Sequence, residues 1–232
     1  MKKASFIALM FLLAVFAPAL QSCQKLEPIQ TIDAIVTIRP DEARNSVTIQ
    51  LDELTTAYPV NIKGSELGAE EKRALINFRK PEDDESVWYS SVGPQIFVNW
   101  MKFILTKPLA ENFGEEENLV QYGEDPVEIL DDWRTLVEDG YLNLRFYTVW
   151  GGNATHRINL VYTPEADNVY CVTLYHDKMG DTSYYESDAM VAFNLGSLPD
   201  THGQTVDLKV KWNSFKGPKS TTFKYCTKKA SE

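Results

Sequence analysis

The chain has 232 residues, of which 44% are hydrophobic and 24% charged, and its formal net charge is -10 at pH 7. This composition is typical of a globular protein and excludes an intrinsically disordered chain. The excess of acidic residues repels polyphosphate, so nucleic acid is not expected as a partner.

The N-terminus has the features of an export signal. Two lysines precede an apolar run from Phe6 to Phe16, which is about half of the ~20 residues that a helix needs to span a bilayer. A basic start followed by a short apolar core is typical of a secretory signal peptide. Residues 20–23, Leu-Gln-Ser-Cys, resemble the lipobox of bacterial lipoproteins. We therefore predict a signal peptide over 1–22 and lipid, palmitate included, on Cys23; the alternative is a soluble secreted protein.

Removal of residues 1–22 changes the formal net charge to -12, because both N-terminal lysines are lost. Several acyl chains on one cysteine hold a protein stably at a membrane, so residues 23–30 are expected to form a lipidated tether. Acidic runs at 82–85 and 115–117 are interpreted as solvated loop faces. Neither run has the alternating oxygen-ligand spacing of a calcium loop.

Alternation with a period of two dominates the remaining sequence and predicts half-buried strands. It is clearest where apolar residues alternate with polar ones at 47–51, 142–146 and 206–210. The single expected helix covers 129–138. The expected strands are 31–39, 45–52, 56–62, 73–80, 96–106, 141–149, 156–163, 169–176, 189–195, 205–212 and 221–227.

The expected strands fall into two groups, separated by an acidic segment that contains two Pro and two Gly. The segment over 108–128 is interpreted as a linker or the start of the next domain. Five strands suit a small OB-like barrel over 31–107, and the later strands suit an immunoglobulin-like β-sandwich over 129–232. The expected fold class is therefore all-β with two domains, and a single eleven-stranded barrel is the alternative.

Six ordered motifs resemble the NigD-like lipoproteins of Gram-negative anaerobes, and the resemblance extends over essentially the whole chain after the signal peptide. The longest is LDELTTAYPVNIKGSELGAEEKRALINFRK, from Leu51 to Lys80. The others are ILTKPL (104–109), GEDPVEIL (123–130), DGYLNLRFYT (139–148), HRINLVY (156–162) and VAFNLGSLPDTHG (191–203).

The resemblance implies an N-terminal OB domain, a C-terminal β-sandwich and a lipid anchor. It also implies a cell-envelope location, at the outer membrane of a Gram-negative bacterium. The family name comes from a bacteriocin operon in which one member was suspected of conferring immunity. The family carries no agreed activity, so the resemblance transfers no site residue.

No constellation of catalytic, metal-binding or cofactor-binding residues is expected. His156, His176 and His202 lack the spacing of a zinc site, and we interpret His202 as part of a turn. There is no GxSxG elbow and no glycine-rich phosphate loop. We therefore expect no catalytic residue, no metal and no cofactor, although a hydrolase with an unrecognised acidic site stays open.

Cys171 and Cys226 could form a disulfide, and the sequence does not decide whether they do. An exported protein meets an oxidising compartment, where a bridge can persist. Strand parity places both cysteines away from the sandwich core, on one outer sheet face. Only neighbouring strands would bring their Cα atoms within roughly 7 Å.

Two aromatic pairs lie in expected loops beside acidic residues: Trp88 with Tyr89, and Tyr184 with Tyr185. Exposed aromatics on loops are typical binding anchors. The expected function is a non-catalytic binding or scaffolding lipoprotein, tethered to the membrane, that recognises an envelope protein or glycan. The alternatives are a bacteriocin immunity protein and the hydrolase.

Overall fold

The computed structural model describes residues 30–41, 43–81, 89–90, 93–182 and 184–228. Residues 31–232 form one compact unit. Among the described residues, no helix is long and apolar enough to cross a membrane. The predicted signal peptide, Cys23 and almost all of the tether lie outside the described residues.

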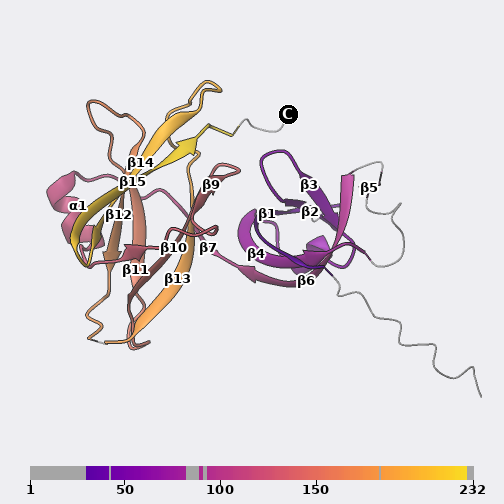
Figure 1. Ribbon diagram of the computed structural model, residues 1–232, viewed down its shortest axis with the longest axis horizontal. Helices are drawn as coiled ribbons and strands as arrows, with labels where there is room; N and C mark the ends of the chain where they lie inside the picture. The colour runs from indigo at the N-terminus through magenta and orange to yellow at the C-terminus, as the bar shows by residue number, and fades with distance from the viewer. Residues whose placement is uncertain (1–29, 42, 82–88, 91–92, 183, 229–232) are drawn as a thin grey trace, which may run out of the picture. The chain divides into compact units, whose positions relative to one another are not determined.

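The first strands of the chain form a closed barrel (Figure 1). The order is β3-β2-β1-β4-β6, and a parallel pairing of β3 with β6 joins the ends, which confirms the predicted OB barrel. The short β5 is paired with β6, and the 3-10 helix η1 (Gly64–Glu66) follows β3. The strands are β1 (Ile32–Asp41), β2 (Ser46–Gln50), β3 (Thr56–Pro59), β4 (Lys72–Arg79), β5 (Tyr89–Ser90) and β6 (Gly93–Phe103).

Alternation places one face of each barrel strand in the core. Ile38, Ile49 and Ile76 are almost completely buried there, on three neighbouring strands. Burial of such side chains stabilises the barrel by about 1.5–3 kcal/mol each.

Two sheets pack face to face in the second half of the chain and confirm the predicted β-sandwich (Figure 1). The first sheet has the order β7-β13-β10-β8, with β9 also paired to β10, and the second has the order β11-β12-β14-β15. Leu144, Leu160 and Leu208 lie in the core that both sheets share. The strands of the first sheet are β7 (Leu105–Pro108), β8 (Glu128–Ile129), β9 (Leu136–Glu138), β10 (Tyr141–Val149) and β13 (Glu186–Asn194). Those of the second are β11 (Arg157–Tyr162), β12 (Cys171–Asp177), β14 (Val206–Ser214) and β15 (Gly217–Tyr225).

The helix predicted over 129–138 is wrong, because this segment contributes β8, a turn and β9. The turn is held by Asp132, which accepts the backbone N–H of Arg134 at 2.9 Å and a guanidinium N–H of Arg145 at 2.7 Å. Partial burial alone would raise the pKa of Asp132, but hydrogen bonds from both arginines lower it to about 2. Asp139 and Gly140, with φ of 51° and 79°, then form the two-residue turn of the β9–β10 hairpin.

The predicted linker over 108–128 is structured and contains the helix α1 (Glu115–Tyr122), which packs on β11 and β12. The acidic run at 115–117, interpreted from sequence as a loop, forms the first turn of this helix, where negative charge is favourable. The acidic run at 82–85 lies outside the described residues.

Only Ile104 separates β6 of the barrel from β7 of the sandwich. Beside this junction the side chain of Arg73 on β4 is fully buried. Its guanidinium donates to Thr37 at 2.7 Å, to Asn143 at 3.2 Å and to Glu138 at 3.4 Å. Arg73 therefore joins barrel residues to the β9–β10 hairpin of the sandwich.

Cys171 and Cys226 are free in the structure, the first buried and the second exposed. The bridge left open by the sequence is not formed, because β14 lies between β12 and β15. Cys171 is in register with Lys209, which is paired with Thr222. Cys226 lies four residues further along the chain from Thr222, a distance of about 13 Å along an extended strand.

Candidate functional site

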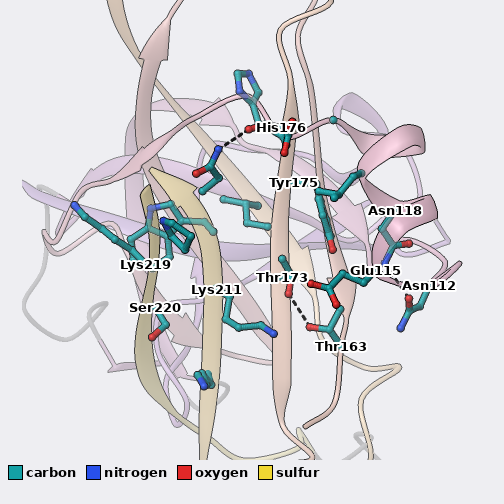
Figure 2. A pocket seen from close by; sticks show the side chains of 18 of the residues that line it. Asn112, Glu115, Asn118, Thr163, Thr173, Tyr175, His176, Lys211, Lys219 and Ser220 are labelled. Carbon is teal, nitrogen blue, oxygen red and sulfur yellow. Dashed lines mark hydrogen bonds between the residues drawn. The ribbon is translucent and has the colours of Figure 1, made fainter. Parts of the chain in front are cut away.

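A groove of about 880 Å³ lies over the second sheet of the sandwich, with α1 as one wall (Figure 2). On the floor of the groove, cross-strand pairing lines up polar side chains from three neighbouring strands. Thr173 of β12 is in register with Lys211 of β14, which is paired with Ser220 of β15. We call these three residues the polar row.

One carboxylate joins two lysines inside the groove. Glu165 accepts hydrogen bonds from Lys209 at 2.8 Å and from Lys211 at 2.9 Å, one on each oxygen. These hydrogen bonds lower the pKa of Glu165 to about 2. Beside them, the hydroxyls of Thr163 and Thr173 lie 2.7 Å apart (Figure 2). The side chains of the groove floor are therefore held in place before any ligand binds.

The helix side of the groove is fixed by amide hydrogen bonds and by one glycine. Asn118 of α1 donates to the side chain of Asn112 at 2.9 Å, as Figure 2 shows. Gly123 ends α1 with φ of 79°, and a Cβ there would lie 2.7 Å from the carbonyl oxygen of His176. A residue with a side chain could not bring the end of α1 so close to β12.

Trp212 also lines the groove. Its side chain is buried, and its indole N–H has no hydrogen-bond partner among the described residues. Buried donors in native proteins are normally satisfied by protein or by ordered water. Trp212 belongs to the core that both sheets share, on the face of β14 opposite Lys211, so this donor is part of the core and not of the polar row.

A second pocket, of about 240 Å³, is lined by residues of both sheets; we call it the end pocket. Phe146 and Ile158 make part of its wall apolar, and Trp150 lies beside them. His176 lines both the end pocket and the groove.

A chain of hydrogen bonds crosses the wall of the end pocket. His156 Nδ1 lies 2.9 Å from His176 Nε2, and His156 Nε2 lies 3.3 Å from Asp181 Oδ2. His176 Nδ1 faces the backbone oxygen of Asp125 at 3.3 Å. Burial lowers the pKa of His176, and the neighbouring His156 lowers it further.

The structure brings some of the sequence-predicted aromatics to one region. Tyr184 and Tyr185 are 93% and 78% exposed, as expected for a loop. The backbone N–H of Trp150 donates to the carbonyl of Tyr185 at 2.8 Å, so these tyrosines lie near the end pocket. Tyr89 lies in β5, and Trp88 lies outside the described residues.

Among the described residues, no three His, Cys, Asp or Glu side chains are arranged to hold a metal ion. The three histidines are also not alike. His156 and His176 meet each other, whereas His202 is exposed in a turn and lies 3.4 Å from Asp200.

A five-stranded OB barrel joined directly to a β-sandwich, with a polar groove on the sandwich, defines a class of two-domain all-β proteins. The NigD-like N-terminal OB domain matches residues 35–91, and the NigD-like C-terminal β-sandwich domain matches residues 110–225. The chain therefore belongs to the NigD-like family. A search of the curated proteins found no match.

Several solved structures have the same fold. A protein from Parabacteroides distasonis described as toxin-related is 35% identical, with a TM-score of 0.71 over 85% of this chain and 94% of that one. A NigD-like immunity protein from Bacteroides caccae is 19% identical, with a TM-score of 0.60 over 86% and 99%. A protein from Bacteroides fragilis described as a lipoprotein is 10% identical, with a TM-score of 0.53 over 88% and 100%.

The groove and the histidine pair were not predicted from the sequence. The alternation over 205–212 placed Lys209 and Lys211 on the outer face, but nothing in the sequence indicated that Glu165 would join them. His156 and His176 were expected near strand ends, and their contact depends on the register in which Ile158 pairs with His176.

Proposed function

We propose that this chain is a non-catalytic binding or scaffolding module of the cell envelope, held at the membrane by lipid on Cys23. Its ligand, an envelope protein or glycan, binds in the groove. The observation that carries the proposal is the polar row, because Thr173, Lys211 and Ser220 offer hydrogen-bonding groups at successive paired positions of one sheet face. Polypeptides and glycans both present regularly spaced polar groups that such a row can bind.

The chemistry of the groove favours binding over catalysis. A general acid needs a pKa near the working pH, whereas hydrogen bonds from Lys209 and Lys211 lower the pKa of Glu165 to about 2. His156 and Asp181 form a histidine–carboxylate pair, but the other imidazole nitrogen of His156 faces His176 instead of a hydroxyl nucleophile.

Tyr184 and Tyr185 supply a second contact surface beside the end pocket. Both rings are largely exposed. Aromatic anchors bury a large area at a small cost in conformational entropy. A ligand too large for the groove alone would reach them.

Immunity against a bacteriocin is a narrower form of the same function. It is favoured by the fold shared with the NigD-like immunity protein of Bacteroides caccae. In that case the ligand would be a toxin, and expression of the chain would protect sensitive cells from it.

The test compares immobilised wild-type protein with the double variant Lys211→Met/Thr173→Val. Each is incubated with the solubilised proteins and, separately, with the polysaccharides of the envelope. We expect saturable binding of one component, weakened about tenfold or more in the double variant because a charged and a neutral hydrogen-bonding group are lost. Lys224→Met is the matched control, since Lys224 is an exposed lysine on β15 paired with Asp207 and does not line the groove.

Equal binding by the double variant and the wild type would contradict the groove as the ligand site. If the variants Tyr184→Ala and Tyr185→Ala bind as the wild type does, the tyrosines are not a second contact surface, and the groove as the ligand site is unaffected. Reproducible hydrolysis of an envelope peptide or glycan would contradict the non-catalytic function.

A further inference from the structure

The hydrogen bonds of the histidine pair can be counted atom by atom. A carboxylate and a backbone carbonyl can only accept hydrogen bonds. His156 Nε2 must therefore donate to Asp181, and His176 Nδ1 must donate to the oxygen of Asp125. The two remaining nitrogens, His156 Nδ1 and His176 Nε2, lie 2.9 Å apart.

If both rings were neutral, each would already have its single hydrogen on the outer nitrogen. Two lone pairs would then face each other across 2.9 Å. Such a contact is repulsive unless a proton or a metal ion lies between the nitrogens. The pair therefore needs a cation that neither neutral imidazole can supply.

The orientation of the rings favours a proton over a metal ion. Two imidazoles pointing at each other along one line, at this N···N distance, would have ring centroids about 5.2 Å apart. A tetrahedral metal ion bound to both nitrogens at about 2.0–2.1 Å would hold them about 3.3 Å apart. The observed N···N distance of 2.9 Å is shorter, and the observed centroid separation of 5.0 Å is close to that of the collinear hydrogen bond.

We propose that His156 and His176 share a single proton, and that this proton fastens the turns around Gly151 and Asp181 to the end of β12. The two turns and His156 meet at one carboxylate oxygen, and His156 links them to His176 at the end of β12. Asp181 Oδ2 accepts the backbone N–H of Gly151 at 2.9 Å and faces His156 at 3.3 Å.

The charge of the shared proton lies on His156. Burial lowers the pKa of His176, which disfavours the imidazolium form of that ring. On His156 the charge is next to Asp181, whose side chain is fully buried. The surrounding charges are paired among themselves: Asp177 with Arg157 at 2.6 Å, and Asp125 with Lys178 at 3.5 Å.

Removal of the proton at higher pH leaves the two lone pairs unscreened. One ring must then turn and give up its outer acceptor, either Asp181 or the carbonyl of Asp125. Because Asp181 is buried, loss of the imidazolium exposes it to water or leaves it without that contact, and the Gly151 turn loosens. Trp150 and Tyr185 lie in these turns, so loosening of the turns would also weaken ligand binding. The effect on ligand binding rests on the proposed function, whereas the shared proton does not.

The test is a pH titration of ¹⁵N-labelled protein by NMR, with long-range spectra that report which imidazole nitrogens carry hydrogen. In mildly acidic solution we expect His176 to be neutral with its hydrogen on Nδ1 and His156 to carry a hydrogen on each nitrogen, as the shared proton requires. Raising the pH should remove one proton from the pair. The protection of the Gly151 amide against hydrogen exchange should then fall about tenfold, because one charge-assisted hydrogen bond is lost.

Three variants make the result specific. His156→Gln cannot donate a hydrogen bond at both ends and should abolish the pH dependence of Gly151 protection. Asp181→Asn keeps the shape of the side chain but removes its negative charge, so the histidine pair should lose its shared proton at a lower pH than in the wild type. His202→Gln should change neither, because His202 is exposed although it also faces a carboxylate.

Two outcomes would overturn the proposal. One is a neutral His156 whose hydrogen lies on Nδ1 at pH 6 in the folded wild-type protein. The other is displacement of the proton by one equivalent of added Zn²⁺ or Cu²⁺, which would make the pair a metal site. Both measurements are made without any ligand. The shared proton can therefore be shown to be wrong whether or not the groove is the ligand site.

Discussion

Arg73 is the largest fully buried side chain among the residues that the structure describes, and burial of its charge has a cost. Removing a cation from water is expensive unless hydrogen bonds and opposite charge replace the solvent. Thr37, Asn143 and Glu138 supply these partners, and the ring of Tyr141 lies 5.5 Å from the guanidinium carbon. Arg73 is thus a buried part of the junction between barrel and sandwich, beside ion pairs such as that of Arg39 with Asp139.

Replacement of Arg73 by methionine should lower the free energy of unfolding by about 3 kcal/mol. The hydrophobic stem is kept, but buried acceptors on both sides of the junction lose their donor. Urea unfolding at neutral pH measures the change. Arg44→Met is the control, since the side chain of Arg44 is 83% exposed and its pair with Asp41 should contribute less than about 0.5 kcal/mol. Equal, small effects of the two substitutions would contradict a role for Arg73 at the junction.

At the scale of elements, the position of α1 against the second sheet depends on how the helix ends. Gly123 has φ of 79° and ψ of 171°, a backbone conformation almost exclusive to glycine, and it lies directly over the end of β12. A Cβ at this position would lie 2.7 Å from both the Cβ of Asp177 and the backbone oxygen of His176. Helix α1 is short, so its stability comes mainly from this packing.

The substitution Gly123→Ala should destabilise the protein by roughly 2–4 kcal/mol, because backbone strain and a steric clash add together. Thermal or urea unfolding measures the loss. Gly152→Ala is matched to it, with a similar φ of 75° but no atom within 4 Å of the added Cβ. That control should cost about 1 kcal/mol, the strain alone. A Gly123→Ala variant as stable as the Gly152→Ala variant would mean that α1 can shift without penalty.

Strands with strict alternation could be located from the sequence, whereas the segment from Ile129 to Glu138 could not. The segment over 129–138 was interpreted as a helix, but the Asp139–Gly140 dipeptide that follows it is a strong hairpin signal. Tertiary pairing with β10 then decides the conformation. The groove could not be predicted, because Glu165 meets Lys209 and Lys211 only after the sheet has formed.

For the whole molecule, the proposed function places two β-domains at a membrane, and no helix among the described residues is long and apolar enough to span it. Acyl chains on Cys23 would supply the anchor, since two or more lipid chains hold a protein stably at a bilayer. About eight residues then separate the lipid from β1, which begins at Ile32. A tether of that length would keep the barrel close to the membrane surface.

Substitution of Cys23 by alanine should abolish incorporation of labelled palmitate and release the protein from the membrane fraction. Labelling of growing cells, followed by separation of membranes from soluble protein, measures both effects. Cys171→Ala and Cys226→Ala serve as controls that keep Cys23. Continued labelling and membrane retention of Cys23→Ala would contradict the lipid anchor.

The pairing of β7 with β13 has a consequence for how the chain acquires its structure. Every strand of the barrel is complete by Phe103, whereas Leu105 finds its partner only at Val191, 86 positions later. Pairing of strands so distant in sequence is slow, and unpaired edges are prone to aggregation in the meantime. If the chain is exported from its N-terminus, the barrel can fold while the rest is still being threaded. The first strand of the sandwich must wait for almost the entire chain, so that a chaperone for the emerging polypeptide would matter most for the second domain.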